Sequence, residues 1–175
     1  MSGRLAIALI FGLALAMGAY GWWHNFQQGR KSLRFWGSDA AVMIRFAPEV
    51  QLLVLQDRAN SGRASETLEI GNRQLAIAEQ FDITRIPGLV HARHALVEDA
   101  SFCWPAGDGT CEPRWQFALR FIRDDRQATV AFDPCCDRVM LVGRTGTAQV
   151  LAERMDAFDR KQLDWANAAG GSGGF

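Results

Sequence analysis

The pattern of apolar and polar positions changes along the chain, and it begins with an unbroken apolar run near the N-terminus. Residues 5–23, LAIALIFGLALAMGAYGWW, contain no charged side chain, and such a run is long enough to cross a bilayer as a helix. Tyr20, Trp22 and Trp23 stand at one end of the run, where amphipathic rings favour the headgroup level. The pattern therefore predicts an N-terminal transmembrane helix or signal anchor over residues 1–23.

A cleaved signal peptide is the alternative, because Arg4 and the small residues at 14–16 fit its pattern. The apolar run continues well past that site, which favours an uncleaved anchor. Arg30, Lys31 and Arg34 follow the run, and counted literally they would leave the domain in the cytoplasm. A short n-region with one Arg is nevertheless ordinary for exported proteins. We expect a single-pass membrane protein with its domain on the extracytoplasmic side.

Beyond the run, the pattern predicts a polar juxtamembrane connector over residues 24–33, an α+β domain over 34–166 and a flexible, Gly-rich tail over 167–175. Ser38 is placed to cap a helix, and Pro87 suits a first helical position. Gly71 and Asn72 tolerate positive φ and predict a hairpin turn. The expected helices cover residues 39–46, 87–98 and 150–165, and the expected strands cover 49–56, 67–70, 74–83, 114–122, 127–132 and 138–143.

The three later strands alternate apolar and polar residues, so their register can be predicted. A two-residue loop at Asp124-Asp125 and a four-residue turn from Pro134 to Asp137 keep the apolar residues on one face. The opposite face carries Gln116, Arg120, Gln127 and Thr129, so it should be at least partly solvated. We expect a small antiparallel sheet covered on one face by helices. The predicted pairs are Phe117–Phe132, Leu119–Val130, Phe121–Ala128, Phe132–Val139 and Val130–Leu141.

Four cysteines should meet at one end of this sheet, namely Cys103, Cys111, Cys135 and Cys136. In an oxidising compartment they predict two disulfides. A vicinal Cys135–Cys136 bridge would be strained, because neighbouring Cα atoms are only about 3.8 Å apart. We expect crossed pairing between the first two cysteines and the last two, and the sequence leaves both crossed forms open. A tetrathiolate zinc site and a redox catalyst fit less well, because the chain lacks the usual ligand spacing and a C-x-x-C motif.

A second candidate site lies on the predicted helix over residues 87–98. His91, His94 and Glu98 follow one another at spacings of three and four, so they share its more polar side, where two imidazoles and a carboxylate are available to a divalent metal. A solvated helix face with a local His94–Glu98 pair explains the same pattern. No H-E-x-x-H, G-x-S-x-G, P-loop or G-x-G-x-x-G motif is present.

Composition narrows the functional classes. Lys plus Arg and Asp plus Glu both number 19, so no net positive field recruits nucleic acid. We expect a non-enzymatic binding domain or an accessory subunit of a membrane-associated assembly, with the membrane and a protein as partners and no cofactor. The alternative is a metal-binding or thiol-based enzyme that uses His91, His94 and Glu98 or the cysteine cluster.

Two segments also carry a resemblance. LRFWGSDAAVMIRFAPEVQLLVL, residues 33–55, and DITRIPGLVHARHALVEDASFCW, residues 82–104, resemble segments of small, single-pass bacterial membrane proteins with no assigned role. The resemblance implies an anchored domain and brings no catalytic motif and no ligand.

Overall fold

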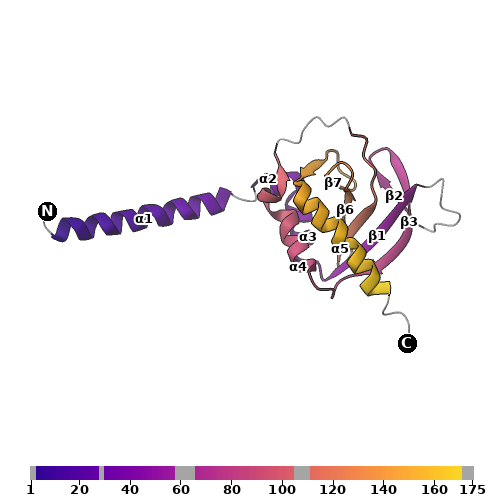
Figure 1. Ribbon diagram of the computed structural model, residues 1–175, viewed down its shortest axis with the longest axis horizontal. Coiled ribbons are helices and arrows are strands. Elements are labelled where there is room, and N and C mark those ends of the chain that lie inside the picture. Colours follow the sequence, from indigo (N-terminus) through magenta and orange to yellow (C-terminus); the bar gives the residue numbers. More distant parts are fainter. Residues whose placement is uncertain (1–2, 28–29, 58–65, 105–110, 171–175) are drawn as a thin grey trace.

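The computed structural model describes residues 3–27, 30–57, 66–104 and 111–170, with the backbone alone for residues 3–6, 8 and 24–27. A long helix precedes an α+β domain (Figure 1), as the sequence predicts. The helices are α1 (Gly3–Gln27), α2 (Arg30–Trp36), α3 (Ser38–Phe46), α4 (Leu89–Val97) and α5 (Ala152–Gly170), with a 3₁₀ turn η2 (Asp99–Ser101). The strands are β1 (Glu49–Asp57), β2 (Thr67–Ile70), β3 (Arg73–Asp82), β4 (Phe102–Cys103), β5 (Phe117–Arg123), β6 (Arg126–Asp133), β7 (Arg138–Leu141) and β8 (Ala148–Val150).

The strands form one antiparallel sheet in the order β2-β3-β1-β5-β6-β7-β8-β4. All five predicted pairs of the central meander are confirmed, from Phe117 opposite Phe132 to Val130 opposite Leu141. Asp124 and Asp137 take positive φ values of 53° and 51° in the two turns, a conformation that Asp tolerates better than most residues. The short turns therefore fix the register, and the alternating pattern fixes which side chains face the core.

Helices cover one face of the sheet, as predicted. Phe117 and Phe132 stack on this face at a centroid distance of 4.7 Å, and Phe158 of α5 packs on Phe132 at 5.1 Å. α5 crosses the front of the sheet in Figure 1, and α2, α3 and α4 lie together at the end nearest α1. Met155 and Trp165 are also buried on α5, so this face holds the main core.

The opposite face is more buried than the sequence predicts. Gln116 and Gln127 are exposed as expected, but Arg120 and Thr129 are only 8% and 6% exposed. Apolar residues from β2 and β3 reach this face and form a second cluster beside them. The Arg120 guanidinium remains paired, with its Nη2 2.6 Å from Oε1 of Glu66. The buried apolar members of this cluster are Leu53, Leu55, Ile70, Leu75, Ala118, Ala131 and Met140.

α1 extends away from the domain (Figure 1). Its side chains are exposed where they are described, including Ile10, Phe11 and Leu15 at 66% to 72%. Within the described residues, no helix reaches the length and apolarity of a membrane span. The transmembrane helix predicted for residues 1–23 is therefore not supported by the described part of α1.

The turn between α2 and α3 depends on Gly37 rather than on the predicted cap Ser38. Gly37 has φ 79°, and no side chain caps α3. The Gly37 N–H donates to the Leu33 carbonyl at 2.8 Å, and its own carbonyl accepts the Ala41 N–H at 3.0 Å. One residue thus ends α2 and begins α3, in a left-handed conformation that favours glycine. Ser38 becomes the first residue of the helix, so the prediction of Ser38 as its cap is wrong.

Several elements lie where the sequence predicts none. α2 begins at Arg30 and buries Ser32, so part of the predicted connector over residues 24–33 belongs to the packed domain. The strands β4 and β8 contain only two and three residues, too few for a pattern to emerge. α5 continues to Gly170, which corrects the start of the predicted flexible tail. Residues 171–175 of that tail lie outside the described residues.

Candidate functional site

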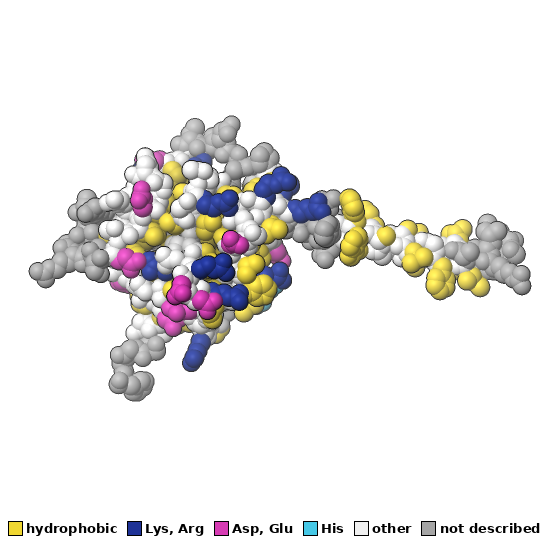
Figure 2. Space-filling view, turned by 180° about the vertical axis from the view of Figure 1, so that it is seen from behind, with side chains coloured by type: hydrophobic (Ala, Val, Ile, Leu, Met, Phe, Trp, Pro, Cys, Tyr) yellow, Lys and Arg dark blue, Asp and Glu magenta, His cyan; other side chains and the backbone are white. Residues whose placement is uncertain are grey.

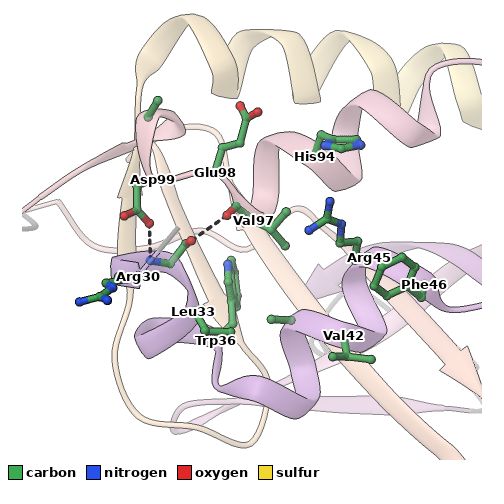
Figure 3. A pocket seen from close by; sticks show the side chains of 13 residues that line it. Arg30, Leu33, Trp36, Val42, Arg45, Phe46, His94, Val97, Glu98 and Asp99 are labelled. Carbon is green, nitrogen blue, oxygen red and sulfur yellow. Dashed lines mark hydrogen bonds between the residues drawn. The ribbon is translucent and has the colours of Figure 1, made fainter. Parts of the chain in front are cut away.

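A cleft of about 710 Å³ lies between α2, α3 and α4 at the end of the domain nearest α1. Figure 3 shows Leu33, Trp36 and Val42 along it, with Arg30 toward one end and Arg45 toward the other. Apolar side chains supply most of the lining, which is typical of ligand and partner sites. The lining residues are Arg30, Ser32, Leu33, Trp36, Ala41, Val42, Arg45, Phe46, His94, Val97, Glu98, Asp99 and Ala100.

The α2 wall is held in place by polar contacts from the far side of the cleft. The Asp99 carboxylate accepts the backbone N–H groups of Lys31 at 3.1 Å and Ser32 at 2.6 Å. Asp99 therefore caps the first turn of α2 although it lies 67 residues beyond Ser32 in the chain. The Ser32 hydroxyl donates to the Val97 carbonyl at 2.7 Å. Figure 3 marks the hydrogen bonds that Asp99 and Val97 accept from Ser32, beside the cleft.

Arg93 holds α3 against α4. Its guanidinium donates to the backbone carbonyls of Arg45 at 3.3 Å and Ala47 at 2.8 Å, the last residues before β1. It also lies 5.8 Å from the centre of the Phe121 ring, within cation–π range. Burial lowers the pKa of Arg93, but an arginine remains charged in a protein. The α3 wall is thus fixed by an internal cation.

The chemistry of the cleft suits binding better than catalysis. Leu33, Val42 and Phe46 are 48%, 43% and 59% exposed, although each is a large apolar side chain. The Arg45 guanidinium lies 5.5 Å from the centre of the Phe46 ring. Exposed apolar side chains beside fixed charges mark interaction surfaces. The sequence carried a signal for this site, since Val42 and Phe46 are one helical turn apart, on the side of α3 away from buried Met43 and Ile44.

The three residues proposed for metal binding are only partly brought together. His94 and Glu98 line the cleft, whereas His91 is not among its lining residues. Glu98 lies just past the end of α4 with an extended backbone (φ −91°, ψ 127°), so it leaves the helical spacing on which the prediction depends. All three side chains are exposed. In the described part of the chain, no three His, Cys, Asp or Glu side chains are arranged to hold a metal ion.

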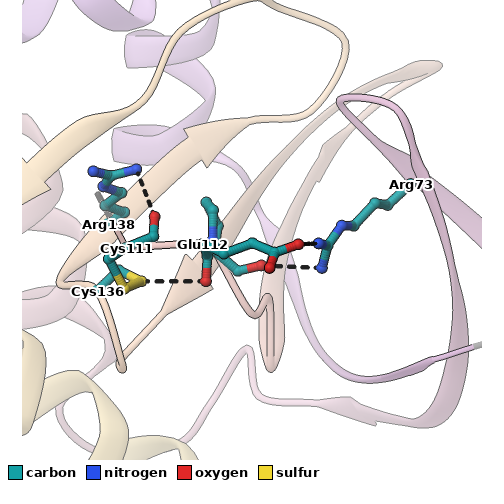
Figure 4. Close-up of polar contacts among 6 residues, drawn as sticks. Arg73, Cys111, Glu112, Cys136 and Arg138 are labelled. Atoms are coloured by element: carbon teal, nitrogen blue, oxygen red, sulfur yellow. Dashed lines mark hydrogen bonds and ion pairs between the residues drawn. A yellow bond between two sulfur atoms is a disulfide. The ribbon is translucent and has the colours of Figure 1, made fainter. Parts of the chain in front are cut away.

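The cysteines form one of the predicted crossed bridges. Cys111 and Cys136 are joined by a disulfide with their Cα atoms 5.9 Å apart, a normal span. Figure 4 shows the bridge with Arg138, which donates to the Cys111 carbonyl at 3.4 Å. Glu112 forms an ion pair with Arg73 of β3. The segment that precedes β5 is therefore tied both to the β6–β7 turn and to β3.

The second predicted bridge is absent, because Cys103 and Cys135 carry free thiols. Cys103 pairs with Gln149 across β4 and β8, Gln149 pairs with Arg138, and Arg138 pairs with Asp133. Cys135 lies in the turn between β6 and β7, so two to three strand spacings of about 4.8 Å each separate it from β4 and Cys103. That span of roughly 10 to 14 Å exceeds the reach of a disulfide. The prediction was wrong because proximity to Cys111 in sequence did not place Cys103 beside the turn.

Asp133 organises the turn that carries the other two cysteines. Its side chain is fully buried, and its Oδ1 accepts the backbone N–H groups of Cys135 at 3.0 Å and Cys136 at 3.3 Å. Burial raises the pKa of the Asp133 carboxyl, while backbone N–H groups and the Arg138 guanidinium oppose that shift. Burial and the Asp156 and Asp133 carboxylates also raise the pKa of Asp137. Ionisation of Asp133 therefore destabilises the fold, whereas the hydrogen bonds that its Oδ1 accepts stabilise the turn.

This arrangement predicts a dependence of stability on pH. A carboxyl group whose pKa is raised in the folded state stabilises the fold in full at pH values below its ordinary pKa of 3.8. That stabilisation is lost as pH rises through the folded-state pKa. Asp133→Asn keeps the acceptor oxygen and should reduce the fall in stability between about pH 4 and about pH 7. Asp133→Ala removes both the acceptor and the titrating group, so it should cost about 1 to 3 kcal/mol near pH 4 and less at higher pH, where the unmodified chain carries the buried charge. Urea unfolding across that pH range measures both effects, and an unchanged pH slope in Asp133→Asn would refute this account.

Neither the cleft nor the cysteine turn can be interpreted by analogy, because the chain matches no protein-family model, no curated protein and no solved structure.

Proposed function

We propose that this chain is a non-enzymatic, membrane-anchored domain that serves as a binding or accessory subunit of a membrane-associated assembly. α1 anchors it, and the cleft between α2, α3 and α4 is its binding site. The observation that carries the proposal is the position of the cleft. Only two residues separate the end of α1 at Gln27 from the start of α2 at Arg30, so the binding site lies directly beside the anchor.

The sequence of α1 supports the anchor. Residues 5–23 are uncharged, and the large apolar side chains described between Ile7 and Trp23 are 58% to 72% exposed. Water disfavours such a helix, because every exposed apolar side chain forfeits the free energy of burial. A bilayer removes that cost, and the aromatic residues at the helix end suit its interface.

The Cys111–Cys136 disulfide supports a domain outside the cytoplasm, because structural disulfides persist in oxidising compartments. The exposed thiol of Cys135 gives a direct test of orientation. A membrane-impermeant maleimide applied to spheroplasts should label Cys135 without lysis, and Cys135→Ser should abolish most of that labelling. Labelling that appears only after lysis would place the domain in the cytoplasm and refute the proposed orientation.

A charge placed in α1 tests the anchor. The chain should remain in the membrane pellet after alkaline carbonate extraction, and Leu13→Arg should release much of it. The expected cause is the insertion cost of a central Arg, about 2.5 to 3.5 kcal/mol on translocon scales. Leu163→Arg in α5 is the matched control, because Leu163 and Leu13 are 55% and 59% exposed. Extraction of the unmodified chain by carbonate alone would refute the anchor.

A further inference from the structure

We infer that the face formed by α2, α3 and the cleft docks on the surface of an anionic bilayer, with Phe46 and Val42 entering the headgroup region. The inference rests on the proposed anchor and names the partner of its binding site. Three features of this face support docking on lipid: its charge, its exposed apolar side chains and its place in the chain.

The first feature is positive charge. α2 carries Arg30, Lys31 and Arg34, α3 adds Arg45, and all four are exposed. Figure 2 shows Lys and Arg side chains gathered where the domain meets α1, with apolar side chains between and beside them. The chain as a whole has no net charge, so this concentration is local. Basic clusters beside a membrane helix are attracted to anionic lipids.

The acidic side chains of the cleft offset this charge only in part. The Asp99 carboxylate accepts two backbone N–H groups at the start of α2, where the positive end of the helix balances an anion. Glu98 is the other carboxylate in the lining, and it lies on the α4 side of the cleft in Figure 3, across from Leu33 and Val42. Asp39 in the first turn of α3 is the one acidic residue of α2 and α3, so the walls formed by these two helices still present a cationic rim.

The second feature is apolar exposure beside that rim. Phe46 and Val42 project from α3 with 59% and 43% of their surfaces exposed, and Leu33 adds 48% from α2. The Arg45 guanidinium over the Phe46 ring joins a cation to an aromatic side chain, the combination found at membrane interfaces. A soluble anion would pair with the basic side chains but would leave these apolar side chains in contact with water.

The third feature is continuity with the anchor. Because only two residues separate α1 from α2, the start of α2 stays within about 11 Å of the end of α1. If that end lies at the headgroup level, the lipid surface is the nearest possible partner. A protein partner would have to displace lipid from the same place. We therefore assign the face to the bilayer.

The test uses the full chain in nanodiscs with a photoreactive side chain, Phe46→benzoylphenylalanine. Irradiation should give lipid adducts in discs that contain phosphatidylglycerol and at least about five-fold fewer in discs of phosphatidylcholine alone, since each basic residue near an anionic surface contributes about that factor. Arg45→Glu should lower the adduct yield in the phosphatidylglycerol discs by about the same factor or more, whereas Arg154→Glu on α5 should leave it unchanged. Leu163→benzoylphenylalanine, a probe of similar exposure on α5, should give few adducts. Val42→benzoylphenylalanine repeats the measurement if the Phe46 variant misfolds.

The outcomes separate the inference from the proposed function. Carbonate extraction of the same membranes is done first, and release of the chain refutes the anchor itself. Retention without lipid adducts from positions 46 and 42 overturns the docking inference alone. So does irradiation of native membranes that yields protein adducts at position 46 in place of lipid adducts. Equal adduct formation in both kinds of disc overturns the role of the basic residues.

Discussion

Replacing Trp36 with alanine should lower the free energy of unfolding by about 3 to 5 kcal/mol, the range for a large buried aromatic side chain. Trp36 is 1% exposed and its ring lies 6.2 Å from that of Phe102 on β4. Its indole N–H donates to the Leu96 carbonyl at 2.5 Å. Trp36→Ala therefore removes one of the contacts that join α2 to α4 and the sheet, and leaves a buried carbonyl without its donor. Urea unfolding of the full chain in mild detergent measures the change.

One variant separates the loss of packing from the loss of the hydrogen bond, and a second serves as a control. Trp36→Phe keeps most of the packing and should cost about 1 to 3 kcal/mol, because the Leu96 carbonyl loses its hydrogen bond. Leu163→Ala on the exposed side of α5 should change stability by less than about 0.5 kcal/mol. A loss below about 1 kcal/mol in Trp36→Ala would show that α2 is not part of the cooperative core, and the cleft would lose its fixed wall.

Loss of the Cys111–Cys136 bridge should lower the free energy of unfolding by up to about 3.5 kcal/mol. The bridge closes a loop with a sequence separation of 25, and the chain-entropy relation gives about 3.5 kcal/mol for such a loop. Cys111→Ser is the suitable change because Cys111 is exposed, so the substitution itself creates no cavity. The melting temperature should fall by on the order of 10 °C. Differential scanning calorimetry of both forms measures the change.

Cys135→Ser is the matched control for that experiment, because it leaves the bridge intact and alters a free, exposed thiol. Its melting temperature should stay close to that of the unmodified chain. Peptide mapping without reduction should recover Cys111 linked to Cys136, with Cys103 and Cys135 alkylated. A linked Cys103–Cys135 pair would contradict the strand order that separates them.

The sequence anticipated the sheet well because its signals there are local. Between Phe117 and Leu141 the apolar residues alternate, and the two turns are short, so a shift of one residue would move every core side chain to the wrong face. The same reasoning failed for Arg120 and Thr129. Their burial depends on side chains that β2 and β3 bring from some fifty residues earlier in the chain, and no local pattern reports such an approach.

By itself, the sequence determined the apolar N-terminal segment, the class of the fold, the register of the central strands and the meeting of Cys111 with the β6–β7 turn. Each follows from periodicity, from turn chemistry or from residues close to a paired strand. Only the tertiary structure decided which thiols pair, because β4 joins the sheet at its far edge and carries Cys103 with it. It alone also created the cleft, since Asp99 caps α2 and Arg93 ties α4 to α3 across long separations in the chain. Alternation and capping act over a few residues, whereas a binding surface depends on which distant segments pack together.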